Sequence, residues 1–309
     1  MSKIFETVTK ARGEIPDLIR TLADVQDGSS PQADGEAKGT GGSSGPVMAP
    51  IEPEALPSEN SSIREIRTIR LRVSAPSPLL PFENGHGRPS EQYRILRTKI
   101  VQHPKQPRLI VVSSPASGDG KSITATNAAA ALSLKSGAHV LLLDADFRKP
   151  AIHTQLGLPE APGLAEVLKG ASRVEDALVR TQEFPNLFVI SSGVPPPNPV
   201  ELLDSTNWEA FCARIRSLFR YTVIDSPPVG AVADYDLIQA ACDGVVLVVR
   251  PDHTNRQSYE KASKTVPRSK LLGVVLNCVT DWSLARNGGS DYYYSGEKMY
   301  QDSSPASGT

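Results

Sequence analysis

The sequence predicts an α/β fold in which a mostly parallel β-sheet is flanked by helices. Two observations lead to this prediction. Short apolar runs alternate with helical stretches, and a Gly-rich turn stands between the first of these runs and an Ala-rich helix. Short apolar runs bounded by turn residues are typical of strands buried on both faces of a sheet. Their alternation with helices indicates right-handed crossovers and therefore a parallel sheet.

Six apolar runs are the expected strands. They are Leu109–Val112, Val140–Leu143, Leu187–Ile190, Tyr221–Ile224, Gly244–Val249 and Leu272–Leu276. A helical segment beginning near Glu91 precedes the first strand, and an Ala-rich helix at Lys121–Ser136 follows it, ended by Gly137. A short strand is also expected near Ile69–Val73. Ligands of such sheets bind at the carboxyl ends of the strands, so polar residues at those ends are the candidate site.

The chain divides into four expected parts. Residues 1–26 have apolar residues at spacings of three and four, which predicts an amphipathic helical extension, either one helix or two separated at Pro16. Residues 27–62 are rich in Gly, Ser, Pro and Ala and are expected to form a disordered linker. Residues 63–280 hold the sheet, with a core that begins near residue 88. Residues 281–309 form a polar tail that is expected to be flexible.

Composition excludes several classes of function. The formal net charge of -1 gives no reason to expect a nucleic-acid surface. No apolar run reaches the roughly 18 residues needed to span a bilayer, and the N-terminus lacks the apolar core of a signal peptide. The expected location is therefore cytoplasmic, with any membrane association made through a partner. Cys212, Cys242 and Cys278 are far apart and lie in apolar stretches, so buried thiols are expected rather than a metal site.

The Gly-rich turn at Ser113–Ser122 predicts a binding site for a nucleotide triphosphate. Gly118 and Gly120 let backbone amides approach a polyphosphate, Lys121 reaches the terminal phosphates, and the hydroxyl of Ser122 ligates Mg²⁺. The strict motif has Gly where this chain has Pro115, but the position between a strand and a helix supports the assignment. The expected nucleotide-binding residues are Ser117, Gly118, Asp119, Gly120, Lys121, Ser122 and Ile123.

Three carboxylates follow expected strands. Asp144 and Asp146 come directly after Leu143, and Asp225 directly after Ile224. Alternate residues of an extended strand end point the same way, so Asp144 and Asp146 are expected to face one magnesium–phosphate cluster. The alternative is a helix-capping Asp beside a surface Asp. With Asp225 as the carboxylate on the neighbouring strand, the candidate metal ligands are Ser122, Asp144, Asp146 and Asp225.

Half of the chain's 8 tyrosines lie in the tail, as Tyr292, Tyr293, Tyr294 and Tyr300. The surrounding sequence is rich in Gly and Ser and too polar to fold, so these phenols are not expected in a core. A nucleotide site in the same chain as an accessible tyrosine cluster indicates a kinase that phosphorylates its own tail.

The motifs together resemble the bacterial tyrosine kinase family. Three of them carry nucleotide chemistry: Gly-Asp-Gly-Lys-Ser at 118–122, Leu-Leu-Leu-Asp-Ala-Asp-Phe-Arg-Lys-Pro at 141–150, and Val-Ile-Asp-Ser-Pro-Pro at 223–228. Three less generic stretches agree: 163–170, 196–203 and the Glu-x-x-Arg-x-x-Arg pattern formed by Glu91, Arg94 and Arg97. The resemblance covers about residues 88–300.

The resemblance implies a phosphate-loop fold of the class that includes partitioning and septum-placement ATPases. It implies that ATP and Mg²⁺ are bound, that Lys121, Asp144, Asp146 and Asp225 are catalytic, and that Asp144 or Asp146 accepts the tyrosine proton. Asn277 is implied to lie near adenine. For Arg148, stabilisation of the transferring phosphoryl group and a salt bridge within the loop are equally consistent with the sequence.

The resemblance also implies partners. Glu91, Arg94 and Arg97 are expected to mediate a homo-oligomeric ring in which each tail enters the neighbouring active site. A membrane polysaccharide co-polymerase, which sets chain length, is the implied activator, and exopolysaccharide or capsule production is the implied process. The chain would then be recruited to the inner face of the plasma membrane through this partner.

Two other functions remain open from the residues. A partitioning ATPase of the same fold would carry an extra Lys five residues before Lys121, where this chain has Ala116. A non-catalytic nucleotide-binding scaffold of a polysaccharide assembly complex is the second alternative. The intact acidic residues and Lys121 argue against a dead site. Hydrolysis without transfer to tyrosine would support the first alternative, and binding alone the second.

Overall fold

The computed structural model describes residues 66–73, 79, 88–251 and 253–279. Their strands are β1 (Arg67–Ile69), β2 (Leu109–Ser113), β3 (Val140–Asp144), β4 (Val179–Thr181), β5 (Leu187–Ile190), β6 (Tyr221–Asp225), β7 (Gly244–Val249) and β8 (Leu271–Leu276). Their helices are α3 (Arg88–Val101), α4 (Lys121–Ser133), α5 (Ile152–Leu156), α6 (Leu164–Leu168), α7 (Val174–Ala177), α8 (Pro199–Leu203), α9 (Thr206–Leu218), α10 (Ala233–Ala240) and α11 (Arg256–Thr265).

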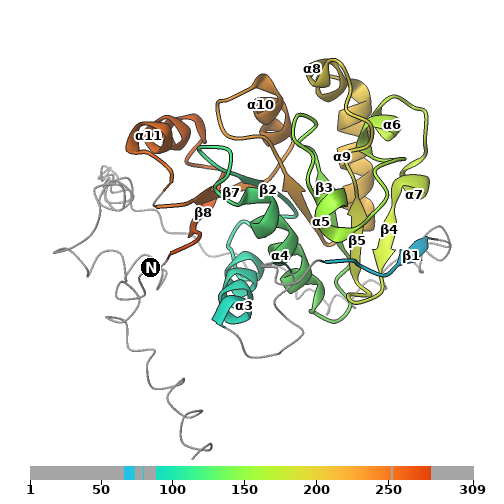
Figure 1. Cartoon of the computed structure of the whole chain (residues 1–309), viewed down its shortest axis with the longest axis horizontal. Coiled ribbons are helices and arrows are strands. Elements are labelled where there is room, and N and C mark those ends of the chain that lie inside the picture. The colour runs from blue at the N-terminus through green and yellow to red at the C-terminus, as the bar shows by residue number, and fades with distance from the viewer. Residues whose placement is uncertain (1–65, 74–78, 80–87, 252, 280–309) are drawn as a thin grey trace, which may run out of the picture. The chain divides into compact units, whose positions relative to one another are not determined.

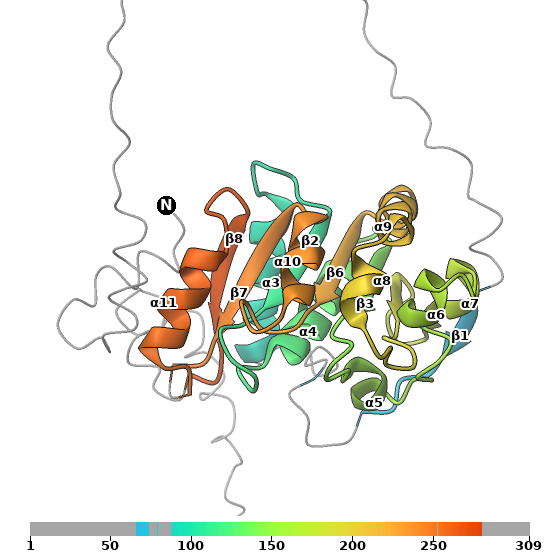
Figure 2. The ribbon, with the colours of Figure 1, turned by 90° about the horizontal axis from the view of Figure 1, so that it is seen from above.

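The strands form one sheet in the order β1-β4-β5-β3-β6-β2-β7-β8. Figure 2 shows them side by side, with β8 at one edge and β1 at the other. Every neighbouring pair is parallel except β4 and β5, which run antiparallel. The predicted class, a mostly parallel sheet flanked by helices, is confirmed. β2, which leads into the Gly-rich turn, lies between β6 and β7.

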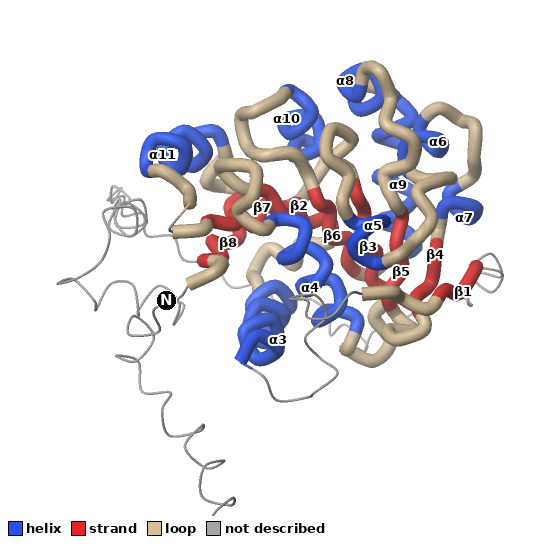
Figure 3. The backbone as a smooth tube through the Cα atoms, in the orientation of Figure 1, coloured by secondary structure: helices blue, strands red, loops and turns tan. Residues whose placement is uncertain are grey.

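Helices cover both faces of the sheet (Figure 1). On one face α4 packs against β2, β3 and β6, and α3 packs on α4. On the other face lie α9, α10 and α11, as the tube in Figure 3 makes clear. The central strands β2, β3, β6 and β7 are buried along their whole length, as expected for strands covered on both faces. This rigid centre holds the ends of β2, β3 and β6 in fixed relative positions.

The expected strands agree with the structure except at the β1 edge. The strand expected near Ile69–Val73 is misplaced, because β1 ends at Ile69. Beyond it the backbone turns to other partners: the Leu71 amide donates to the Glu183 carboxylate (3.1 Å), and the Arg72 amide donates to the Leu156 carbonyl (2.9 Å). β4 was not predicted, since three residues are too short to give a periodic signal.

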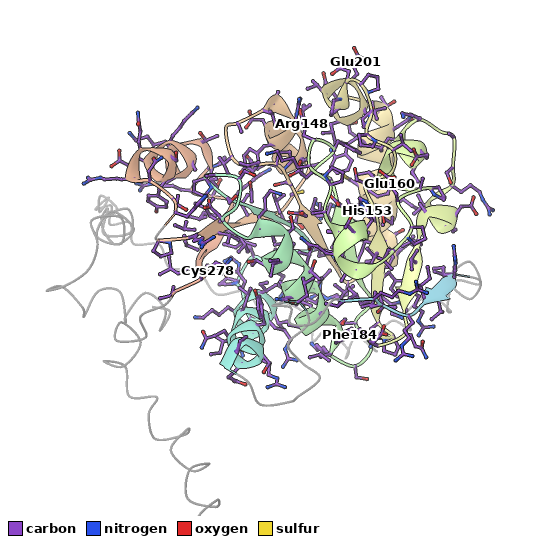
Figure 4. The ribbon with its side chains drawn as sticks, viewed as in Figure 1. Arg148, His153, Glu160, Phe184, Glu201 and Cys278 are labelled. Atoms are coloured by element: carbon purple, nitrogen blue, oxygen red, sulfur yellow. The ribbon has the colours of Figure 1, made fainter. Side chains whose placement is uncertain are left out.

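The cysteine expectation is partly wrong. Cys212 and Cys242 are buried as expected, but Cys278 is exposed. It follows the end of β8, where its backbone has φ 55 and leaves the sheet, so its side chain does not enter the core. Cys278 is labelled beside β8 in Figure 4.

Several expectations fall outside the described residues. These are the helical extension at 1–26, the linker at 27–62 and the tail at 281–309 with Tyr292, Tyr293, Tyr294 and Tyr300. Among the helices that the structure does describe, none has the length and apolar character required to cross a bilayer.

Candidate functional site

The predicted site residues meet at the carboxyl ends of three adjacent strands. Asp144 is the last residue of β3 and Asp225 the last of β6, and the two residues are paired in the register of these parallel strands. On the other side of β6, Val112 of β2 pairs with Asp225, and the chain continues from β2 into the Gly-rich loop. The register of the sheet therefore places the loop and the carboxylates side by side, as the sequence predicts.

The Gly-rich loop has a backbone that requires glycine. Gly118 and Gly120 both have φ 93, in the left-handed region that other residues rarely adopt. At Gly120 a Cβ atom would also lie only 2.0 Å from the side-chain nitrogen of Asn277. Gly120 is the residue that precedes the first turn of α4, where unpaired amides and the helix dipole favour a bound anion.

Lys121 is held between two carboxylates. Its Nζ lies 2.7 Å from Oδ2 of Asp146, 3.6 Å from Oδ1 of Asp225, and 3.4 Å from the Ser122 hydroxyl. Burial alone lowers the pKa of the Lys121 ammonium, but Asp225 and Asp146 outweigh this effect and raise the pKa. The positive charge that the sequence assigned to phosphate binding is thus held at the end of the loop, beside two of the three predicted acids, Asp146 and Asp225.

Asp225 is a fully buried carboxylate that accepts from no backbone amide, with the Lys121 ammonium and the Ser122 hydroxyl as its polar neighbours. Burial raises its pKa to about 7, even though Lys121 and Ser122 act in the opposite direction. A buried carboxylate with so few donors is costly, and such a group usually faces an ion or solvent.

Asp144 uses its oxygens differently. Oδ2 accepts from the backbone amides of Ala151 and Ile152, both at 3.1 Å, and Oδ1 accepts from the amide of Asp146 at 3.2 Å. It therefore caps the start of α5, which is one half of the alternative that the sequence left open; the other half, a surface Asp, does not hold, because Asp146 is buried. Burial raises the pKa of Asp144 to about 6, while the three amides oppose that shift.

The residues present fit a magnesium ion held in part by phosphate. Mg²⁺ prefers oxygen ligands and commonly takes one or two carboxylates, with phosphate oxygens and water completing the octahedron. Asp225 supplies a carboxylate that accepts from no backbone amide, and the hydroxyl of Ser122 lies beside it and near Lys121. Within the described part of the chain, no three acidic, His or Cys side chains are grouped as a self-sufficient metal site. The four predicted ligands thus do not form a complete cage by themselves.

Arg148 forms a salt bridge instead of pointing freely into the site. Its Nε and Nη2 donate to the two carboxylate oxygens of Asp234, both at 2.9 Å. Asp234 lies in the first turn of α10 and is fully buried. Figure 4 shows Arg148 beside α10. Of the two roles that the sequence left open, the structure contains a salt bridge, but with Asp234 of α10 and not within the loop, so it joins the segment after β3 to the segment after β6.

The remaining predicted residues occupy two places. Ser117 and Ile123 flank residues 118–122 of the loop, and Ser117 is exposed. The Asn277 side chain donates to the Asp119 carbonyl at 2.9 Å. Contact of Asn277 with adenine stays a prediction. Glu91 and Arg94 form a pair with each other on α3 at 3.3 Å, outside the strand-end cluster.

Sequence reasoning missed three residues at this site: Asp234, His253 and Thr254. Asp234 lies nine residues after Asp225, and nothing in the sequence indicates that it faces Arg148. His253 and Thr254 follow β7, whose carboxyl end reaches the same edge, and both donate to the side chain of Asp119. The rule that ligands gather at strand ends could have flagged them.

Curated relatives of this chain are tyrosine kinases. It is 38% identical over 192 residues to the tyrosine-protein kinase YwqD of Bacillus subtilis, covering 61% of this chain and 80% of that protein. It is 35% identical over 194 residues to the tyrosine-protein kinase CpsD of Streptococcus agalactiae, covering 62% and 84%. It is 30% identical over 230 residues to the putative tyrosine-protein kinase CapB of Staphylococcus aureus, covering 73% and 98%. No protein-family model matches the chain.

Solved structures agree. The chimerical protein CapA2B2 superposes with a TM-score of 0.61 at 33% identity, covering 68% of this chain and 92% of that one. The tyrosine kinase domain of BceF gives a TM-score of 0.54 at 34% identity, covering 61% and 76%. With the phosphate loop, its lysine and the strand-end acids in place, the chain belongs to the bacterial tyrosine-protein kinase family.

Proposed function

We propose that this protein is an ATP- and Mg²⁺-dependent autokinase that phosphorylates the tyrosines of its own tail, in trans, within a ring of identical subunits. The observation that carries the proposal is the position of Lys121, whose ammonium lies between Asp146 and Asp225 at the start of α4. The ammonium group is next to the backbone amides that can bind a triphosphate. It is also next to the acids that can bind a metal ion and accept the tyrosine proton.

The chain's own residues account for the main requirements of phosphoryl transfer. The amides from Gly118 to Ser122 hold the phosphates, and Lys121 exchanges its contact with Asp146 for the terminal phosphate oxygens. The bond between the tyrosine oxygen and the γ-phosphorus forms as the bond to the ADP oxygen breaks. The phenolic proton passes to a carboxylate. Mg²⁺, when bound, would neutralise charge on the phosphates, and Ser122 and Asp225 are the residues that would hold it.

Asp144 and Asp146 remain the two candidates for the proton acceptor, and their different contacts separate them experimentally. Asp144 supports α5 through backbone amides, whereas Asp146 pairs with Lys121. We expect Asp144→Asn to lower both stability and transfer, because an amide cannot accept as well at all three positions. We expect Asp146→Asn to lower transfer while nucleotide binding is kept, since it frees Lys121.

Buried tyrosines elsewhere support the tail as the acceptor. Tyr221, Tyr235 and Tyr259 have side chains that are at most 3% exposed. Burial also raises the pKa of Tyr259 to about 12 and that of Tyr235 still higher, which opposes attack by either oxygen. Phosphorylation of these residues would require unfolding of the core, so the acceptors are proposed to be Tyr292, Tyr293, Tyr294 and Tyr300.

The partners belong to the same proposal. Glu91, Arg94 and Arg97 lie on α3, and we propose that they form intersubunit salt bridges in the ring. We propose that a membrane polysaccharide co-polymerase activates the kinase and brings it from the cytoplasm to the inner face of the plasma membrane. Added phosphates, each with a charge of roughly -1.5 to -2, would repel neighbouring subunits and open the ring, linking phosphorylation to exopolysaccharide or capsule export.

Intact-mass analysis after incubation with ATP and Mg²⁺ tests the proposal. The parent protein is incubated in two parallel samples, one with and one without the cytoplasmic segment of the activator. It is expected to gain mass in steps of one phosphate. Lys121→Met and a variant with all four tail tyrosines changed to Phe are expected to gain none. Tyr93→Phe is the matched control, because it removes a tyrosine outside the tail, and it should behave as the parent. Phosphorylation of the four-Phe variant at the parental level would refute the proposed acceptors.

A further inference from the structure

Asp119, in the middle of the phosphate loop, has a side chain directed into the protein. Its carboxylate is fully buried. Oδ2 accepts from the Ala116 amide at 2.9 Å, which closes the loop on itself. Oδ1 accepts from the Thr254 hydroxyl at 2.8 Å and from Nδ1 of His253 at 2.9 Å. An acidic group inside a loop that receives phosphates is therefore turned away from them and held by three hydrogen-bonding partners from two segments.

The partners of Asp119 outside the loop follow the ends of β7 and β8. His253 and Thr254 belong to the turn after β7, which is itself closed by bonds from their amides to the Arg250 carbonyl at 2.9 and 2.7 Å. The Thr254 hydroxyl also accepts from the Arg250 amide at 3.0 Å, so it is used both as donor and as acceptor. From the end of β8, Asn277 donates to the Asp119 carbonyl at 2.9 Å.

This arrangement affects the position of the amides that bind phosphate. Asp119 lies between Gly118 and Gly120, two residues with few intrinsic conformational restraints. Without external contacts such a loop would sample many backbone conformations, and ordering it would reduce the free energy of nucleotide binding. The contacts of the Asp119 side chain and carbonyl fix the residue between the two glycines, and so fix the directions of the amides on either side.

We infer that Thr254 and His253 are positioning residues for the nucleotide phosphates, acting through Asp119. The inference rests on the proposed use of ATP and deepens it. Thr254 is buried, and its hydroxyl bonds to both the Arg250 amide of the turn and the Asp119 carboxylate of the loop, so it is the more constrained of the two residues. His253 is the more exposed member, with 44% of its side chain accessible, and its ring would lie 3.3 Å from a Cβ atom added at Gly118. Neither residue is expected to touch the reacting atoms.

The first experiment compares Thr254→Val with Thr254→Ser. Val has nearly the shape of Thr but cannot donate to Asp119, whereas Ser keeps the hydroxyl. We expect Thr254→Val to weaken binding of a fluorescent ADP analogue by about 10-fold, the loss of one hydrogen bond to a charged group, and to raise the KM for ATP by a similar factor. Thr254→Ser should bind as the parent does. The kcat for phosphorylation should change by less than about 3-fold in both, since the loop is ordered once ATP is bound.

The second experiment tests whether the effect passes through Asp119. We expect His253→Ala to weaken binding of the ADP analogue about 3-fold, but to have a smaller effect when Asp119 is already changed to Asn, because the two residues act on one contact. Thr265→Val removes a hydroxyl that bonds only within α11, to the Lys261 carbonyl, and serves as the matched control with parental binding expected. Thermal unfolding of each variant separates a loss of fold from a loss of positioning.

Each outcome has a distinct meaning. Equal affinities of Thr254→Val and Thr254→Ser for the ADP analogue overturn the inference, as does a loss confined to kcat. Additive effects of His253→Ala and Asp119→Asn overturn the route through Asp119. If the parent binds the analogue and the variants follow the expected order, the inference stands even when no tyrosine is phosphorylated, which would refute the proposed function alone.

Discussion

The phosphate loop and the strand-end acids are neighbours, but their polar groups are satisfied to very different degrees. In the loop, the Asp119 carboxylate is buried among donors from Ala116, His253 and Thr254. One strand away, the Asp225 carboxylate is equally buried, yet its polar neighbours are only the Lys121 ammonium, at 3.6 Å, and the Ser122 hydroxyl. The loop carboxylate is thus held by three donors, whereas Asp225 accepts no backbone amide.

The difference indicates how the two regions divide the work. A loop that is already ordered loses little entropy when phosphates bind. A carboxylate that is buried with few donors is energetically unfavourable in its ionised form, and binding of a cation beside it offsets this cost. Stability and catalysis should therefore respond in the same direction to changes in the loop and in opposite directions to changes at Asp225. The following predictions test this contrast.

Asp225→Asn is expected to have the largest effect on activity. Removal of the charge that faces Lys121 and the metal should reduce phosphorylation by about 10²-fold or more. The nucleotide-free variant should nevertheless unfold at a higher temperature than the parent at pH 8, because an amide avoids the cost of an ionised buried acid. Kinase assays and thermal unfolding of the same preparation check both parts. A variant with lower stability at pH 8 would contradict the proposed imbalance at this residue.

Gly120→Ala is expected to reduce activity and stability together. The residue has φ 93, and an added Cβ would meet the Asn277 side chain. The strained backbone alone costs about 1–3 kcal/mol. We expect a lower unfolding temperature and weaker binding of an ADP analogue. Gly137→Ala is the control for the conformational cost, since that glycine also has positive φ (73) but would meet no atom within 4 Å. Equal binding of the two variants would show that the crowding at Asn277 has no role.

Most of the sheet could be predicted because its strands are buried on both faces and read as continuous apolar runs. The runs at β5 and β7 give the bounds of the strands without error. The meeting of Asp144 and Asp225 was also predictable, because parallel strands end at the same edge. β4 was not, since its three residues carry no periodic pattern and pair with β5 in the opposite direction.

The contacts between side chains could not be predicted from spacing. Arg148 and Asp234 are 86 residues apart, and Asp119 and Thr254 are 135 apart. Each pair depends on loops whose paths are set by the sheet order. Asp144 illustrates the same limit, since a carboxylate after a strand fits both a metal ligand and a helix cap. Only the positions of the Ala151 and Ile152 amides reveal that it caps α5.

Arg148→Ala tests the connection between the two acidic segments, with a smaller expected effect than the changes above. The variant leaves the buried Asp234 without its two-point partner, which costs about 1–3 kcal/mol. Thermal or denaturant unfolding should detect the loss, and phosphorylation should fall because Asp146 and Asp225 lie on the joined segments. The double variant Arg148→Met with Asp234→Asn should be more stable than Arg148→Ala, since no charge is left unpaired. If the double variant is the less stable one, the pair does not act as a unit.

The smallest effect expected is a dependence of stability on pH that comes from the same acids. Burial raises the pKa of Asp144 to about 6 and that of Asp225 to about 7, both above the usual value of 3.8. Between pH 3.8 and 7 the folded protein thus binds more protons than the unfolded chain. The contribution of these groups to stability is complete below pH 3.8 and is lost as pH rises through 6 and 7.

The nucleotide-free parent should therefore lose part of its stability between pH 6 and pH 8. Asp225→Asn should reduce that loss, because one of the two titrating acids is gone, while contributions from histidines remain the same in both proteins. Unfolding temperatures of parent and variant at the two pH values give the comparison. An unchanged difference in the variant would mean that Asp225 is already ionised in the folded protein at pH 6. In that case Lys121 and Ser122 would be sufficient to stabilise the ionised Asp225 carboxylate. The contrast between the hydrogen bonding of Asp119 and that of Asp225 would then not hold.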